Sequence, residues 1–170
     1  MDQTGVPELS KPRKTAAELM SELEKDPAFL RRSAERQHRL DERQLKVDVA
    51  LSPLIRNLNE NGFPGSTLNE VVERNAPLPV NAVELLLACL PQLHEERSLE
   101  SIIRTLGAAS VTFDGRPLIE CFQRSSDESV RWAVVNTIAL THPHSIDEWL
   151  NEKLRHEYWG KTLRELGFQK

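Results

Sequence analysis

The sequence contains few of the residues that mark several classes of protein. It has two cysteines, one tyrosine and seven glycines in 170 residues, and no apolar run approaches the roughly 18 residues of a membrane span. Cys89 and Cys121 lie far apart within apolar helical patterns, which favours reduced, buried thiols over a disulfide or a metal pair. The N-terminus lacks the basic-then-apolar pattern of a signal peptide. We therefore expect a cytoplasmic protein without a membrane segment.

Motifs for catalysis and for cofactors are also missing. The chain has no glycine-rich phosphate loop, no Gly-x-Ser-x-Gly and no His-Glu-x-x-His. The only close pair of histidines, His142 and His144, flanks Pro143 without a third nearby ligand, and a turn that ends a helix accounts for it. We expect no enzymatic activity, no metal and no cofactor.

Charge is low overall but unevenly distributed. The formal net charge of -4 argues against extensive nucleic-acid binding, because that affinity depends on clustered cations. Residues 31–46 nevertheless carry six cations and three anions, so this window is +3 and the remainder of the chain is -7. A local basic surface on an acidic protein is the result.

Helical periodicity is the dominant pattern that is present. A long helix is predicted from Asp26 to about Asn61, because Asp26 can cap it, Pro27 fits its first position and Gly62 can stop it. Pro53 lies in its interior, and we expect a kink or a break near Ala50. A shorter helix, residues 16–25, precedes it, with Thr15 and Glu18 spaced as a capping box.

Two adjacent stripes follow the long helix. The apolar stripe consists of Phe29, Leu40, Val47, Leu51, Leu54 and Leu58, and the basic stripe of Arg32, Arg36, Arg39, Arg43 and Lys46. The basic stripe is either a solvated face or a docking surface for an acidic partner or a phosphate backbone. The sequence leaves open whether this half of the helix pairs with a second copy of itself.

The remainder of the chain alternates short helices with turns. A helix beginning at Ser66 is followed by three helical hairpins over residues 80–107, 114–141 and 145–167, with Asp114, Asp127 and Ser145 as predicted caps. The period near 30 residues is typical of stacked helical repeats, in which no unit can bury its apolar face alone.

The stretch from Asp127 to Ala139 resembles the second helix of a HEAT repeat, with an acidic cap, then Val130-Arg131, then spaced aliphatic residues. The N-terminal part, from Ala17 through the Arg-rich helix to Leu90, resembles the opening of a group of bacterial HEAT-repeat proteins without an assigned activity. The resemblance implies an all-α, right-handed α-solenoid of about three HEAT-like hairpins over residues 79–170. A helical N-terminal cap over residues 15–78, continuous with the repeats, and a flexible tail over residues 1–14 would precede it.

HEAT-like solenoids generally hold a protein or peptide, so the resemblance implies a non-catalytic protein-interaction scaffold or adaptor. The candidate contact residues are those of the basic stripe together with Arg104, Arg131, Trp132, Trp149 and Trp159. Packing between repeats is the alternative role for these tryptophans and for Arg104 and Arg131. Two other functions stay open: a nucleic-acid-binding protein, including a DNA glycosylase-like one, and an immunity or antitoxin-like protein whose acidic surface meets a basic toxin.

Overall fold

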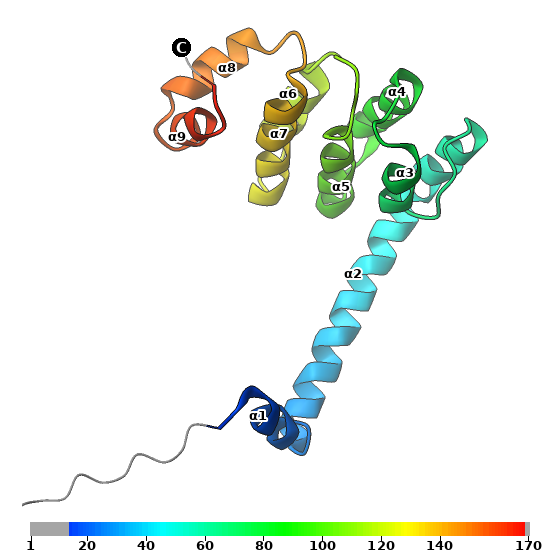
Figure 1. The fold of residues 1–170 in the computed structure, drawn as a ribbon, viewed down its shortest axis with the longest axis vertical. Helices are drawn as coiled ribbons and strands as arrows, with labels where there is room; N and C mark the ends of the chain where they lie inside the picture. The colour runs from blue at the N-terminus through cyan, green and yellow to red at the C-terminus, as the bar shows by residue number, and fades with distance from the viewer. Residues whose placement is uncertain (1–13, 169–170) are drawn as a thin grey trace, which may run out of the picture. The chain divides into compact units, whose positions relative to one another are not determined.

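The computed structural model describes residues 14–168, which form nine α-helices, one short 3-10 helix and no strand (Figure 1). The all-α prediction is therefore confirmed. The predicted tail over residues 1–14 lies outside the described residues, Lys14 excepted. Contacts divide the chain into two compact units, the first ending at Gln44 and the second beginning at Leu45. The predicted division between cap and repeats at residue 79 stays a prediction.

The first unit opens with helix α1, Ala16–Leu23. Its predicted capping box is present, since the Thr15 amide donates to the Glu18 carboxylate at 2.9 Å and the Glu18 amide donates to the Thr15 hydroxyl at 3.3 Å. None of the described side chains of this unit is buried. The capping hydrogen bonds therefore stabilise the start of α1, and no buried apolar core in the described part of this unit adds to them.

Helix α2, Pro27–Glu60, is 34 residues long and crosses the boundary between the units. Asp26 caps it as predicted, accepting a hydrogen bond from the Ala28 amide at 2.8 Å. The helix continues through Pro53 without interruption, so the break expected near Ala50 does not occur. A proline removes one backbone hydrogen bond from a helix. Burial of the apolar side chains on both sides of Pro53, Leu51 and Leu54, offsets this loss of stability.

The second unit holds the core. It contains the later part of α2 and seven further α-helices: α3 Leu68–Asn75, α4 Val80–Cys89, α5 Glu96–Leu106, α6 Arg116–Arg124, α7 Glu128–Thr141, α8 Asp147–Arg155 and α9 Glu157–Glu165, with the 3-10 helix η1, Leu90–Gln92, after α4. Helix α4 packs on α5, α6 on α7, and α8 on α9. Helices α3, α5 and α7 lie side by side (Figure 1), with α5 in contact with both of its neighbours.

Of the three caps predicted in the second unit, one is at its predicted position and two are not. Gly115 and not Asp114 stands at the cap position of α6, because the Asp114 carboxylate lies one residue earlier, where it accepts from the Arg116 amide at 3.1 Å. Asp127 caps α7 as predicted, accepting from the Ser129 amide at 2.7 Å. Ser145 does not cap α8: its backbone is left-handed, with φ of 64°, and Ile146 stands at the cap position without a side-chain hydrogen bond. The cap prediction is wrong because the Ser145 hydroxyl lies 2.9 Å from Nδ1 of His144 instead.

Two loop contacts recur along the second unit. Leu78, just before α4, pairs with Ala109 after α5, and Asp114, just before α6, pairs in the same parallel sense with His144 after α7. Leu78 and Asp114, the first residues of the two pairs, are 36 positions apart in the sequence, and the second residues, Ala109 and His144, are 35 positions apart. The second contact requires glycine at position 115, where a Cβ atom would lie 2.3 Å from a side-chain carbon of Ile146.

Candidate interaction surfaces

The basic stripe lies along α2 and is exposed over its whole length, with Arg32, Arg36, Arg39, Arg43 and Lys46 all reaching solvent. In the part of the chain that the structure describes, none of these side chains forms an ion pair or a hydrogen bond with another residue. The neighbouring Glu42 instead lies 3.5 Å from His38. The structure thus leaves five cations available to a partner.

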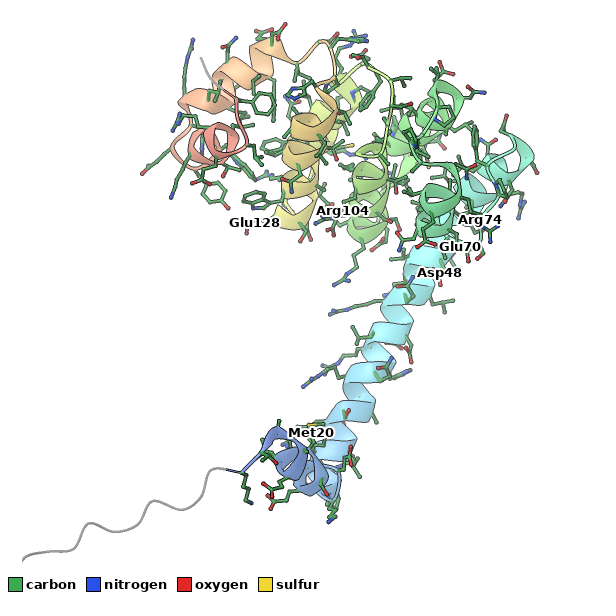
Figure 2. All side chains as sticks on the ribbon, viewed as in Figure 1. Met20, Asp48, Glu70, Arg74, Arg104 and Glu128 are labelled. Carbon is green, nitrogen blue, oxygen red and sulfur yellow. The ribbon has the colours of Figure 1, made fainter. Side chains whose placement is uncertain are left out.

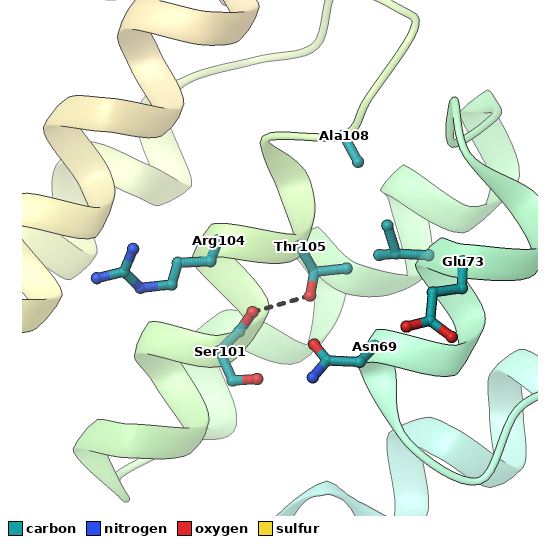
Figure 3. Close-up of a pocket in the computed structure, with 7 residues that line it drawn as sticks. Asn69, Glu73, Ser101, Arg104, Thr105 and Ala108 are labelled. Carbon is teal, nitrogen blue, oxygen red and sulfur yellow. Dashed lines mark hydrogen bonds between the residues drawn. The ribbon is translucent and has the colours of Figure 1, made fainter.

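A cleft of about 340 Å³ opens between α3 and α5 in the second unit (Figure 3). It is lined by Asn69, Val72, Glu73, Ser101, Arg104, Thr105 and Ala108. The Thr105 hydroxyl donates to the Ser101 carbonyl at 2.9 Å. The side chains of Asn69 and Glu73 have no hydrogen-bond or ionic partner among residues 14–168. The cleft therefore presents an amide and a carboxylate whose hydrogen-bonding capacity is unused within the chain.

Arg104 stands at the edge of this cleft, on α5 (Figures 2 and 3). Its side chain is 56% exposed and forms an ion pair with Glu100 one turn earlier, at 2.8 Å. An exposed pair of this kind contributes little to stability. Arg104 is thus the one repeat arginine of the sequence prediction that the structure leaves accessible to a ligand.

Arg131 has a different role. It is half-buried, its Nε donates to the Ser125 carbonyl at 2.9 Å, and its guanidinium carbon lies 5.5 Å from the centre of the Phe122 ring. These contacts hold the turn between α6 and α7. Of the two roles considered for Arg131, contact with a partner or packing within the chain, these contacts correspond to packing.

Trp149 and Trp159 are buried, with 5% and 7% of their surfaces exposed. Both rings meet Phe122 edge to face at centroid distances of 5.2 Å, which joins α6, α8 and α9 in one aromatic cluster. The Trp149 indole N–H finds no hydrogen-bond partner there. The two side chains are therefore core residues, and only Trp132 among the three tryptophans is accessible at a surface.

Trp132 takes part in a short polar chain that the sequence did not predict. Its indole N–H donates to the Tyr158 hydroxyl at 3.2 Å, and that hydroxyl donates to Glu128 at 3.0 Å. Tyr158 is 47% exposed. The adjacent position of Tyr158 and Trp159 was a weak signal, since neighbouring residues on a helix point in directions about 100° apart and a polar-tipped tyrosine beside a buried tryptophan can reach the surface.

Metal and thiol chemistry find no support in the geometry. Among the described residues, no group of three His, Cys, Asp or Glu side chains is placed to hold a metal ion. Burial raises the pKa of the Cys89 and Cys121 thiols, which disfavours the reactive thiolate.

No helix in the described part of the chain has both the length and the apolar content that crossing a bilayer requires.

Comparison with known proteins gives no relative for this chain. No family model matches it, and neither a curated protein nor a solved structure does so. The exposed surfaces of the two units therefore carry the functional argument by themselves.

Proposed function

We propose that the chain is a non-catalytic protein-interaction module of the HEAT-like α-solenoid type, and that it binds its partner along the face of α3, α5 and α7. The observation that carries this proposal is the cleft between α3 and α5, whose Asn69 and Glu73 side chains have no partner within residues 14–168. Polar groups on the surface of adjacent helices are available for recognition without a change in the fold.

The repeating loop contacts support the solenoid part of the proposal. The pairs Leu78–Ala109 and Asp114–His144 recur at intervals of 36 and 35 residues, each next to a pair of packed helices. Recurrence of one supersecondary unit at a fixed interval is the property that defines a helical repeat array. Such arrays present a row of equivalent helices to a partner.

The chemistry of the cleft fits an extended peptide segment. The Asn69 amide can both donate to and accept from a peptide backbone, as a neighbouring strand would. The Glu73 carboxylate favours a lysine or arginine side chain nearby, whereas Arg104 on the opposite helix favours an acidic one. A peptide carrying charges of both signs, a few residues apart, would satisfy all three groups.

A photo-crosslinking amino acid at position 69 tests the proposal in cells that produce the protein. We expect irradiation to give discrete protein adducts that survive nuclease treatment and that Glu73→Arg on the same chain abolishes. The same amino acid at Glu120, exposed on α6, is the matched control and should give none of these adducts.

Two results would count against this function. Equal adducts from positions 69 and 120 would mean that the α3–α5 face is not a specific surface. Adducts that disappear with nuclease would favour the nucleic-acid alternative, whose affinity should also fall steeply with salt.

A further inference from the structure

Apolar side chains on the first part of α2 are left uncovered. Leu30 and Leu40 are 49% and 46% exposed, whereas Leu51, Leu54 and Leu58 on the later turns of the same helix are at most 7% exposed. The later side chains are covered by the core of the second unit. The described residues leave each of the earlier ones about half exposed.

The exposed Leu30 and Leu40 can be placed in one heptad register with Val47 and the buried leucines that follow. If Leu30 is assigned to position a, the seam residues recur at alternating intervals of three and four. They are Leu30, Gln37 and Gln44 at positions a, and Ser33, Leu40 and Val47 at positions d. The same register continues into the buried Leu51, Leu54 and Leu58. Three of the six seam positions before Leu51 are polar, and the exposed Leu45 and Val49 lie outside the seam. The apolar seam by itself therefore predicts only weak pairing, and the charges beside it must select the partner.

Charged residues flank the seam in a complementary way. The g positions carry Arg36 and Arg43, and the e positions carry Asp41 and Asp48. In a parallel pair of helices, each g residue faces the e residue five positions later on the other helix, so both arginines would meet aspartates. In an antiparallel pair, g faces g, and arginine would meet arginine. The charges therefore select a parallel arrangement.

We propose that residues 30–48 of α2 associate with a second copy of this chain as a parallel, two-stranded coiled coil. Gln37 and Gln44 of the two copies then meet in the same layers, where polar residues at position a fix register and strand number at some expense of stability. The coiled coil ends after Val47, because from Leu51 onward the seam side chains are buried in the second unit. Beyond that point the two helices separate.

The hydrogen bonds within α2 are compatible with this pairing. The Gln37 amide nitrogen donates to Asp41 Oδ1 at 2.8 Å, which leaves the second oxygen of Asp41 available to Arg36 of the other copy. Neither Arg36 nor Arg43 has an acidic partner of its own within the described chain. Association would thus give both arginines an acidic partner on the other copy.

Complementary charge reversal tests the proposal by the mass in solution, for which the chain mass is 19.4 kDa. We expect the unaltered protein to double its mass with rising concentration in analytical ultracentrifugation. The variants R36D/R43D and D41R/D48R each carry one sign of charge at both e and g. Each should dimerise at least about tenfold more weakly, and their equimolar mixture should form a heterodimer.

The matched control is R39D/K46D, which makes the same change in charge at positions c, away from the seam. It should dimerise like the unaltered protein, and a loss equal to that of R36D/R43D would overturn the proposal. An unaltered protein that stays monomeric from micromolar to millimolar concentration would overturn it as well. All altered side chains are exposed, so far-ultraviolet circular dichroism should show unchanged helix content.

Disulfide trapping tests the orientation. Position 37 meets its own equivalent only in a parallel dimer, so Gln37→Cys should form an intermolecular disulfide rapidly on mild oxidation. Glu35→Cys, on the outer face at position f, should not, and the unaltered protein with Cys89 and Cys121 sets the background. Rapid trapping at position 35 but not at 37 would contradict the parallel coiled coil.

Discussion

Leu40 and Leu58 lie on the same stripe of α2, yet 46% of Leu40 is exposed and Leu58 is fully buried. The second unit surrounds its part of the helix with a core that extends from Leu51 to Leu163. The first unit has no buried side chain among its described residues. The comparison shows that periodicity specifies which face of a helix is apolar, whereas the rest of the chain or another molecule decides what covers that face.

The largest difference between the two units should appear on removal of apolar side chains. Ile102 is fully buried between neighbouring helices, so Ile102→Ala should lower the free energy of unfolding by about 2–5 kcal/mol. Leu19→Ala, at a half-exposed site of α1, should change it by less than about 0.5 kcal/mol. Urea denaturation measures both, and comparable losses would contradict the assignment of the core to the second unit alone.

A smaller effect is expected from a polar residue that joins parts of the second unit. The Arg124 guanidinium on α6 donates to the carbonyls of Leu90, Pro91 and Leu93, at and just after η1. Arg124→Ala should cost about 1–3 kcal/mol because these carbonyls lose a charged donor. Arg97→Ala is the control, since that exposed side chain makes no such contact in the described chain. Equal thermal midpoints for the two variants would contradict a stabilising role for the Arg124 hydrogen bonds.

Helix capping should make a still smaller contribution. Asp127→Ala removes the acceptor for the Ser129 amide and should destabilise the second unit by about 1 kcal/mol. Asp127→Asn keeps an acceptor and should restore most of that loss. A chemical denaturation series on the three proteins would show the order, and Asn no better than Ala would indicate that the cap hydrogen bond is unimportant.

The smallest expected effect is on the stability of the fold at low pH. Hydrogen bonds from Arg116 lower the pKa of the Asp114 carboxyl from 3.8 to about 2. Because the pKa in the folded state is depressed, the stabilisation is present above pH 3.8 and is lost as the pH falls through 2. Asp114→Asn should therefore flatten the decline of the thermal midpoint over this interval. Glu18→Gln, in the first unit, serves as the comparison. Hydrogen bonds from Thr15 lower the pKa of Glu18 as well, but its helix has no buried side chain, so the thermal midpoint of the second unit should decline as before.

Features set by neighbouring residues were predictable from the sequence. The capping box of Thr15 and Glu18 and the caps at Asp26 and Asp127 need only local spacing, and the basic stripe follows from helical periodicity. Ser145 escaped prediction because the conformation of its loop depends on contacts with residues about 30 positions earlier. The cleft could not be predicted for the same reason, since Asn69 and Arg104 come to line one cleft only when α3 packs on α5.

The burial of Trp149 and Trp159 was likewise an open alternative at the level of sequence. Helical spacing puts an aromatic residue on a face, but the partner that buries it, here Phe122 on α6, is 27 residues or more away. Composition alone therefore could not separate a contact tryptophan from a core tryptophan. The surface position of Trp132 and its hydrogen bond to Tyr158 depend on how α7 and α9 lie next to each other, which the sequence does not give.

Hydrogen exchange at two protein concentrations tests most directly the claim that the first unit is completed by a second copy while the second unit is complete in itself. We expect amides of residues 30–44 to exchange quickly in dilute protein and to become protected as concentration rises. Amides of α5 and α7 should be equally protected in both samples. Protection of residues 30–44 that does not change with concentration would contradict the account.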